Sequence, residues 1–366
     1  MSSPIRVLQV VTHMNRGGLE TMLMNYYRHI DREKVQFDFL THRDYDGDYG
    51  KEIKSLGGKI YHLPVLNPFS GSYKKALNEF FNKHHEYKIV HVHQDCMSSV
   101  ILEVAKKQGV PVRIAHSHSS NQDKNIKYPI KLYYKAKISK YATNLMACGE
   151  AAGKWMFGGM SFTVLNNAID TSAYKYNPEI HNEQRSKYGI NNKEILIGHI
   201  GRFSPPKNHT FLIDIFNSVQ KEIPAKLMLV GEGKLKNQIE KKVQDLGIAD
   251  KVIFTGLRTD VENLLQAMDL FLFPSLYEGL PVTMIEAQAS GLPCLISDKV
   301  SMECKVTSNV QQIPLSSSLE EWTEMVIKKV KKNERCSDIS KIKDAGFDIE
   351  ENARWLQKYY LRLDKK

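Results

Sequence analysis

Short runs of β-branched and aromatic residues alternate with amphipathic windows along this chain, and that alternation limits the folds open to it. Strands that alternate with helices form parallel sheets covered by helices on both faces. The pattern begins at residue 5 and starts again at residue 195. The expected strands are IRVLQVV, VQFDFL, KIYHLPV, IVHVH, VRIAH and NLMAC, then ILIGHI, AKLMLVG, KVIFTG, DLFLFP, PCLIS and VQQIPL. The sequence therefore predicts an α/β protein with two doubly wound, Rossmann-like domains facing a central cleft.

The domain boundary is expected near residue 175, inside the polar, Asn-rich connection of residues 163–194. A length of 366 residues also favours two domains. Residues 1–175 form the first predicted domain and residues 176–349 the second. After residue 315 the chain reads as helices only, and the last helix has an apolar face suited to docking on a neighbouring domain. We therefore expect residues 350–366 to pack back on the first domain.

Charge and cysteine content restrict the partners and the compartment. A net charge of +10 favours an anionic partner, such as a phosphorylated metabolite, nucleic acid or an acidic membrane surface. A merely soluble basic protein explains the charge about as well. Five cysteines lie far apart without a CxxC pair, which indicates a reducing, intracellular compartment. We find neither a signal peptide nor an apolar run of membrane-spanning length, so we expect a cytoplasmic protein or one attached at a membrane surface.

Glycines and histidines follow strands of the first half. Gly18 follows Gly17 at a strand-to-helix turn, where N–H groups can approach a phosphate, although a plain tight turn explains the pair equally. The pattern is not GxGxxG, so nothing favours a nicotinamide cofactor. His116 and His118 are expected to point into the cleft, where His118 could bond a sugar or stabilise a developing charge. No metal is expected there, because no Cys or carboxylate stands at ligand spacing.

Two histidines of the preceding strand, His91 and His93 in IVHVH, are better read as satisfied core residues. A histidine in a satisfied core is also the competing interpretation for His118.

A cation pair follows the first strand of the second half. Arg202 and Lys207 stand in the loop GRFSPPKN, ahead of a helix. Two cations at a strand-to-helix loop can grip a diphosphate together with the helix N-terminus. A solvated loop would also contain them. The loop is not a Walker A motif.

Two glutamates stand in an otherwise nearly uncharged run, SLYEGLPVTMIEAQASGLP. Glu278 is expected in a cleft-facing loop and Glu286 on the following helix, buried by its apolar neighbours. The backbone amides from Gly279 to Val282 would form the free end of that helix, a second anion site. A surface Glu and a Glu favoured by the helix dipole explain either residue alone, but not both in so apolar a run.

A basic segment, Lys124 to Tyr141, carries no acidic residue and interleaves lysines with tyrosines. Such a segment can rest on an anionic membrane or receive a phosphorylated lipid. A solvated basic face accounts for it about equally.

Taken together, these motifs resemble the retaining GT-B-fold glycosyltransferases of family four, a group that includes many bacterial exopolysaccharide and capsule enzymes. The resemblance rests on GGLE, HSH, NNAID, GRFSPPKN, VGEG, FTG and EGLPVTMIE, with an E-x7-E spacing, and spans nearly the whole chain. Two departures are mild: Ala168 and Asn208 stand where the family often has Gly. Asp46-Gly47-Asp48 superficially resembles a metal-binding DxD, but its setting indicates a turn.

The resemblance implies a role for each site residue. Arg202 and Lys207 would bind the donor diphosphate, and Glu286 the ribose. Glu278 would contact the donor sugar, and His118 would contact it near its reacting carbon. The remaining donor contacts would come from Gly18, Leu257, Gly279, Leu280 and Val282.

The resemblance implies a metal-independent retaining transfer from a UDP-linked or other nucleoside diphosphate sugar to a growing glycan, including one on a membrane lipid. No cofactor and no nucleic-acid partner are expected. The departing diphosphate would itself accept the acceptor's proton. Two alternatives stay open: a same-fold epimerase, and a non-catalytic module that binds nucleotide sugars.

Overall fold

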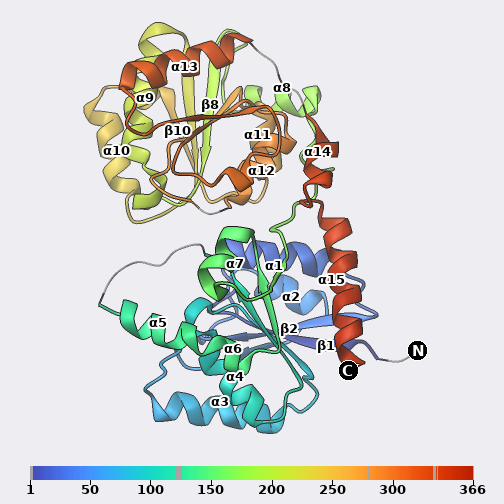
Figure 1. The fold of residues 1–366 in the computed structure, drawn as a ribbon. Helices are drawn as coiled ribbons and strands as arrows, with labels where there is room; N and C mark the ends of the chain where they lie inside the picture. The colour runs from blue at the N-terminus through green and yellow to red at the C-terminus, as the bar shows by residue number, and fades with distance from the viewer. Residues whose placement is uncertain (1–2, 120–125, 279, 333–334, 336, 366) are drawn as a thin grey trace. The chain divides into compact units, whose positions relative to one another are not determined.

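The computed structural model describes residues 3–119, 126–278, 280–332, 335 and 337–365. The chain forms two compact units, each of which has α/β architecture (Figure 1). The first unit comprises Met1–Ala168 and Asp348–Lys366, and the second comprises Ile169–Phe347. The fold is therefore α/β with two domains built on parallel sheets, as the alternation of strands and helices predicted.

The sheet of the first unit has the order β3-β2-β1-β4-β5-β6-β7, and its neighbouring strands pair in parallel. Its strands are β1 (Ile5–Val10), β2 (Val35–Thr41), β3 (Ile60–His62), β4 (Ile89–Val92), β5 (Val112–Ser117), β6 (Asn144–Ala147) and β7 (Thr163–Val164). The sequence pattern missed β7, because a two-residue strand is too short to show any alternation. The sequence pattern instead predicts that the interdomain connection starts at this stretch.

Helices cover both faces of this sheet because its strands bury side chains on both sides. On β1, Val7 packs in one core and Leu8 in the other. One face carries α1 (Gly18–His29), α2 (Gly50–Ser55) and α15 (Ile349–Asp364). The other face carries α3 (Gly71–Lys83), α4 (Ser98–Lys107), α6 (Ile138–Tyr141) and α7 (Glu150–Phe157). Helix α5 (Tyr128–Ala136) buries none of its residues.

Helix α15 belongs to the first unit although it ends the chain, and it packs on α1, β2 and β4 (Figure 1). The chain leaves the first unit at Ala168, earlier than the predicted boundary near residue 175. Two bonds explain the difference. Ile169 N–H donates to the carbonyl of Phe347 at 3.0 Å, and the Tyr174 hydroxyl donates to Glu286 at 2.9 Å. The polar composition of residues 163–194 indicated a connection between the units. It did not indicate which unit each residue of the connection packs on.

The second unit repeats the doubly wound arrangement with the strand order β10-β9-β8-β11-β12-β13, again parallel. Its strands are β8 (Ile195–Ile200), β9 (Ala225–Val230), β10 (Val252–Gly256), β11 (Leu270–Phe273), β12 (Cys294–Ser297) and β13 (Val310–Ile313). One face packs on α9 (His209–Glu222), α10 (Lys236–Asp245) and α13 (Leu319–Lys332). The other packs on α11 (Val261–Ala267), α12 (Val282–Ala289) and α14 (Ile339–Asp344). Helix α8 (Pro178–Lys187) lies against α11.

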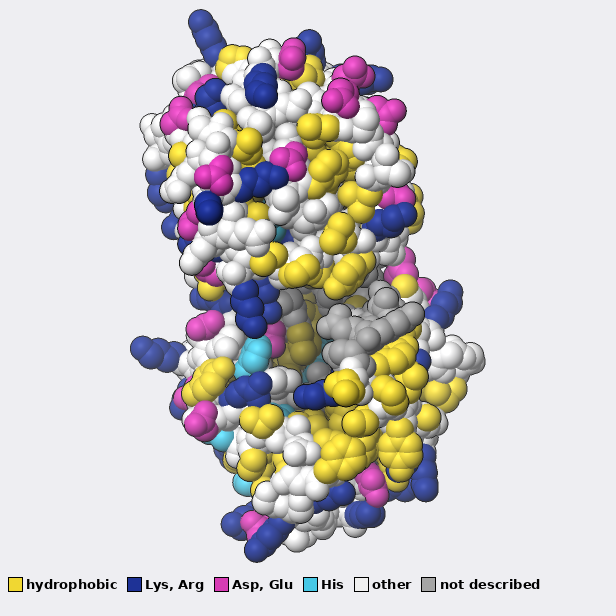
Figure 2. Space-filling view, turned by 90° about the vertical axis from the view of Figure 1, so that its left-hand side faces the viewer, with side chains coloured by type: hydrophobic (Ala, Val, Ile, Leu, Met, Phe, Trp, Pro, Cys, Tyr) yellow, Lys and Arg dark blue, Asp and Glu magenta, His cyan; other side chains and the backbone are white. Residues whose placement is uncertain are grey.

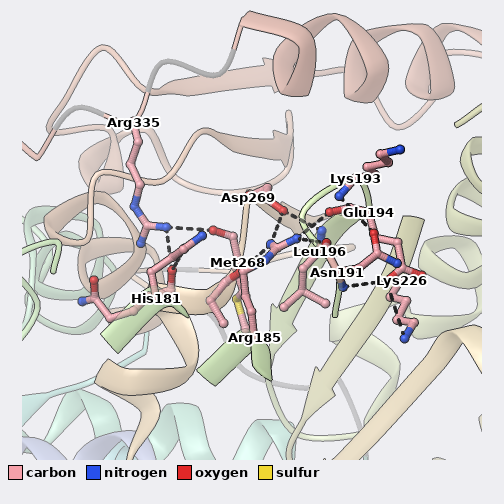
Figure 3. A network of polar contacts seen from close by, with 12 residues as sticks. His181, Arg185, Asn191, Lys193, Glu194, Leu196, Lys226, Met268, Asp269 and Arg335 are labelled. Atoms are coloured by element: carbon pink, nitrogen blue, oxygen red, sulfur yellow. Dashed lines mark hydrogen bonds and ion pairs between the residues drawn. The ribbon is translucent and has the colours of Figure 1, made fainter. Parts of the chain in front are cut away.

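A polar network ties α8 to the amino ends of β8 and β11 (Figure 3). Arg185 pairs with Asp269 at 2.8 Å, and the same carboxylate accepts the N–H of Leu196 at 2.7 Å. Arg335 donates to four carbonyls, those of Leu265, Gln266, Met268 and Ser290. Burial lowers the pKa of Arg335 to about 10. Ligands of open α/β sheets bind at the carboxyl ends of strands, so we assign this network to stability.

Among the helices that the structure describes, none is both long and apolar enough to cross a membrane.

Candidate functional site

An ion pair in the second unit joins the loops that follow β8 and β11. The Nζ atom of Lys207 lies 2.7 Å from Oε1 of Glu278, and the two side chains are 16% and 17% exposed. Strands β8 and β11 are neighbours, and the strand order reverses between them. In doubly wound sheets this reversal opens the crevice in which ligands bind. The structure thus brings two sequence-predicted site residues together at such a point.

Backbone contacts fix the loop that carries Arg202 and Lys207. A Cβ atom on Gly231 would lie 2.2 Å from the carbonyl oxygen of Gly201, and one on Gly233 would lie 2.4 Å from that of Phe203. Only glycine allows the loop after β9 to approach so closely. This packing holds the loop in place and leaves the Arg202 side chain exposed.

Asn208 explains one of the departures from the family pattern. It adopts the left-handed conformation, with φ of 53°, directly before α9. Asn tolerates this region better than other non-glycine residues, and its side chain donates to the carbonyl of Pro274 at 3.0 Å. That bond links the loop of Lys207 to the loop of Glu278.

Glu286 lies on α12 and is 9% exposed, as its apolar neighbours predicted. Burial raises the pKa of its carboxyl to about 7, while the hydrogen bond from Tyr174 acts in the opposite direction. Among the residues that the structure describes, this carboxyl accepts from one donor, the hydroxyl of Tyr174, at 2.9 Å. It retains acceptor capacity for further hydroxyl groups, such as those of a ribose.

The predicted run of amides ahead of α12 is interrupted. Pro281 occupies the N-cap position and has no N–H, so it cannot contribute to an anion site. Leu280 and Val282 are partly buried and can contribute backbone N–H groups. Gly279, which was predicted to belong to this series, lies outside the described residues.

The two remaining predicted donor contacts lie apart from the ion pair in the sequence. Leu257 directly follows β10 in the second unit and is 60% exposed. Gly18 is the first residue of α1 in the first unit, and a Cβ atom there would meet nothing within 4 Å. Packing within the first unit therefore does not require a glycine at this position.

Four histidines gather at the carboxyl ends of β4 and β5 in the first unit. His91 and His93 are buried, as expected of core residues. His116 was expected to point into a cleft, but it is only 1% exposed and shares a 3.0 Å hydrogen bond with His91. That prediction is wrong because His116 lies on β5, an interior strand of the sheet, where its ring bonds to that of His91. His118 shares a 2.8 Å hydrogen bond with His93.

Three of these rings lie close enough together to be considered as a metal-binding site. One ring nitrogen from each of His91, His93 and His116 lies within 4.8 Å of the others. Hydrogen bonds already engage both nitrogens of His91 and both of His93. A metal would have to break them, so the observed arrangement suits neutral, mutually bonded rings.

Sequence reasoning missed two groups of the second unit. Tyr174 donates a hydrogen bond to Glu286. It lies in the connection between the units, for which the sequence predicts no part in the site. His199, on β8, donates from Nδ1 to the carbonyl of Leu272 at 2.9 Å, while its buried Nε2 has no partner among the described residues. That nitrogen lies beside Gly201, because a Cβ atom there would be 3.1 Å from it. Its place in ILIGHI, two residues before the loop glycine Gly201, was the available signal.

Comparison with solved structures identifies the class of fold. The Anabaena protein Alr3699/HepE in complex with UDP and glucose gives a TM-score of 0.79 at 17% identity, covering 97% of this chain and 99% of that chain. Sucrose-phosphate synthase from Thermosynechococcus elongatus gives 0.76 at 15% identity, covering 98% and 99%. The fold is that of the GT-B glycosyltransferases.

Sequence comparison then identifies the family. Residues 16–173 match Glycosyltransferase Family 4, and residues 180–343 match Glycosyl transferases group 1. EpsF of Bacillus subtilis (strain 168), whose name describes it as a glycosyltransferase, is 34% identical over 98% of this chain and 97% of its own length. The capsular polysaccharide biosynthesis glycosyltransferase CapH of Staphylococcus aureus is 26% identical over 98% and 99%. The chain belongs to this family of glycosyltransferases.

Proposed function

We propose that the protein is a retaining, metal-independent glycosyltransferase that moves a sugar from a UDP-linked donor to a glycan of a capsule or exopolysaccharide. The observation that carries the proposal is the pairing of Lys207 with Glu278 at the strand-order reversal of the second unit. A relative named for capsular polysaccharide biosynthesis, and a fold neighbour in complex with UDP-glucose, support the same substrate classes.

The donor diphosphate would bind at the loop after β8. Arg202 is exposed, and no ion pair to it occurs in the described part of the chain, so it is available to an incoming anion. Lys207 would pass from Glu278 to the diphosphate, which frees the Glu278 carboxylate to accept hydroxyl groups of the sugar. Glu286, held by Tyr174, would accept the ribose hydroxyls.

In the reaction, the bond between the anomeric carbon and the diphosphate oxygen breaks. The acceptor oxygen bonds to that carbon on the same face, and its proton passes to the departing diphosphate. Arg202 and Lys207 stabilise the negative charge that develops on this diphosphate. No metal is required in this scheme, because two cationic side chains supply the positive charge.

The test combines binding and turnover. A thermal-shift screen of UDP and UDP-sugars should find a donor that raises the unfolding temperature, because ligands that bind the folded state stabilise it. Lys207→Ala and Glu286→Ala should abolish transfer, whereas Lys241→Ala, an exposed lysine of the same unit, should not. Full activity in either site variant would refute the donor-site assignment. Loss of activity in EDTA would refute metal independence.

Assays without acceptor separate the alternatives. An epimerase would convert the nucleotide sugar with no acceptor present, and a binding module would bind it without turnover. The proposal expects transfer only when a glycan acceptor is present.

The acceptor would be carried on lipid, at the cytoplasmic face of a membrane that the first unit contacts. Helix α5 buries none of its residues, and its apolar side chains at Ile130, Leu132 and Tyr133 are exposed, as is the preceding Ile126. Figure 2 shows hydrophobic side chains gathered on this face of the first unit. Lysines are interspersed with these apolar residues in the sequence. An anionic lipid surface therefore fits both the apolar side chains and the lysines. Lys124, the first residue of the predicted basic segment, lies outside the described residues.

Vesicle co-sedimentation tests this contact. The protein should bind vesicles that contain phosphatidylglycerol and not vesicles of phosphatidylcholine alone, because the lysines require an anionic surface. Leu132→Ser should weaken binding, whereas Leu246→Ser should not. The two leucines are equally exposed, at 38%, but Leu246 lies in the second unit. Equal binding by both variants would exclude α5 as the contact.

A further inference from the structure

The histidines of the first unit form two hydrogen-bonded branches that meet at Gln9. In the first branch, Oε1 of Gln9 lies 2.9 Å from Nε2 of His93, and Nδ1 of His93 lies 2.8 Å from Nε2 of His118. Nδ1 of His118 is buried and has no hydrogen-bond partner among the residues that the structure describes. The branch therefore ends on an unpaired nitrogen of the residue that was predicted to contact the donor sugar.

The second branch runs from Gln9 through the C-terminal helix. Nε2 of Gln9 donates to the hydroxyl of Tyr360 at 3.3 Å, and this hydroxyl lies 2.7 Å from Nδ1 of His91. Nε2 of His91 lies 3.0 Å from Nδ1 of His116. Nε2 of His116 is buried and, like Nδ1 of His118, has no partner in the described part of the chain.

Each ring of the two branches carries a single ring N–H. Burial lowers the pKa values of His91 and His118 to about 3 and those of His93 and His116 well below the usual value, so all four rings are neutral at neutral pH. A neutral imidazole has one donor and one acceptor nitrogen. Fixing one proton in such a chain therefore fixes the others.

The Gln9 amide decides the direction of both branches. Its oxygen accepts only, so the proton of His93 lies on Nε2, and Nδ1 of His93 accepts from Nε2–H of His118. The bare Nδ1 of His118 is then an acceptor. Because Tyr360 accepts from the Gln9 amide, its one proton points to His91, and the chain ends on the N–H of His116. Turning the amide over would reverse every proton in both branches.

We propose that Gln9 and His93 are positioning residues that hold His118 as the Nε2–H tautomer, so that Nδ1 accepts a hydrogen bond from a hydroxyl of the donor sugar. The proposal rests on the donor role of His118 in the proposed function. It excludes a role for His118 as a hydrogen-bond donor to developing negative charge, since the only ring N–H already points to His93.

Nuclear magnetic resonance on the full chain tests the tautomer without any ligand. Long-range ¹H–¹⁵N correlation spectra of ¹⁵N-histidine-labelled protein distinguish protonated from bare ring nitrogens, and His118→Asn assigns the His118 signals by their loss. The expected result is a protonated Nε2 and a bare Nδ1. Protonated Nδ1 on His118 would overturn the proposal, as would bound Zn²⁺ at the histidines in protein incubated with ZnCl₂.

Gln9→Leu removes both amide groups and should leave His118 as a mixture of tautomers. Gln108→Leu, a change at a glutamine of α4's C-terminal end, should not alter the His118 signals. An unchanged His118 tautomer in Gln9→Leu would show that Gln9 does not position it.

Ligand titration separates this inference from the proposed function. The probes are UDP, UDP-glucose, UDP-galactose and UDP-N-acetylglucosamine. A UDP-sugar that binds should shift the Nδ1 signal of His118, and UDP should not. Gln9→Leu should weaken binding of that UDP-sugar about tenfold and leave UDP binding unchanged. If no UDP-sugar binds, the donor role fails together with the sugar contact, whereas a tautomer that depends on Gln9 still establishes the positioning role.

Discussion

Replacing Glu286 by Gln is expected to remove a pH dependence from the stability of the second unit. Burial raises the pKa of Glu286 from 4.5 to about 7. Between these values the folded state keeps a proton that the unfolded state releases, so the free energy of unfolding falls as pH rises. The contribution is complete below pH 4.5 and lost above pH 7. A shift of roughly 2.5 units corresponds to about 3 kcal/mol.

Part of this stability is already lost at pH 5. The linkage relation gives a loss of about 0.8 kcal/mol at pH 5 and about 3.3 kcal/mol at pH 8. The neutral amide of Glu286→Gln has no such dependence. The difference in unfolding free energy between the variant and the natural chain should therefore shift by about 2.5 kcal/mol in favour of the variant from pH 5 to pH 8.

Urea denaturation at the two pH values measures this difference, provided that the second unit is followed by itself. Trp322 is fully buried in the second unit, while Trp155 and Trp355 belong to the first. A Trp155→Phe, Trp355→Phe background makes Trp322 the sole tryptophan reporter, because the chain has three tryptophans. Glu222→Gln, a change at an exposed carboxyl on α9, serves as the control. An equal effect of Glu286→Gln at pH 5 and pH 8 would refute the reasoning.

Three further changes follow from contacts of the second unit. Tyr174→Phe should raise the pKa of Glu286, since the Tyr174 hydrogen bond opposes the effect of burial, and should weaken UDP binding about fivefold in calorimetry. Arg335→Met leaves the buried carbonyls of Leu265, Met268 and Ser290 without the Arg335 donor, whereas that of Gln266 keeps its bond to His181. The change should destabilise the second unit by about 3 kcal/mol or more, measured through Trp322, with Arg335→Lys intermediate; a loss under about 1 kcal/mol would contradict this. Gly233→Ala places a Cβ atom against the backbone of Phe203, so it should cost about 1–3 kcal/mol and weaken UDP binding by displacing the Arg202 loop. Gly247→Ser is strained by the φ of 67° at that position but meets no neighbouring atom, so it should leave UDP binding unchanged.

Most strands could be predicted because strands buried in a parallel sheet appear in the sequence as continuous runs rich in β-branched residues. The two residues of β7 carry no such signal, and only their pairing with Met146 and Ala147 defines the strand. The domain boundary could not be placed closely for a related reason. Residues 169–175 lie in a mostly polar connection, but their membership of the second unit depends on bonds to Phe347 and Glu286, which are far away in the sequence.

The sequence indicated which buried strands Lys207 and Glu278 follow, but not that the two residues pair. Lys207 and Glu278 each follow a buried strand, which the sequence shows. Their meeting requires β8 and β11 to be neighbours, and that follows only from the strand order. The histidine branches show the same limit. Period-two alternation in IVHVH and IAHSH places each pair of histidines on one face of its strand. The sequence does not show which face of the sheet carries the histidines, because that depends on the neighbours of β4. It also does not show that Gln9 and Tyr360 connect the histidines, because that depends on the position of α15.

Both sheets place their polar groups where the strand order reverses, yet they fill that position with different chemistry. In the second unit the reversal lies between β8 and β11 and holds a lysine paired with a glutamate. In the first it lies between β1 and β4 and holds Gln9 with neutral histidines. Charged groups suit a diphosphate, and neutral acceptors with fixed tautomers suit uncharged hydroxyls. Raising the salt concentration should therefore weaken UDP binding, because salt screens the attraction between charges. The ratio of UDP-sugar affinity to UDP affinity should remain nearly constant, because screening has little effect on hydrogen bonds between neutral groups.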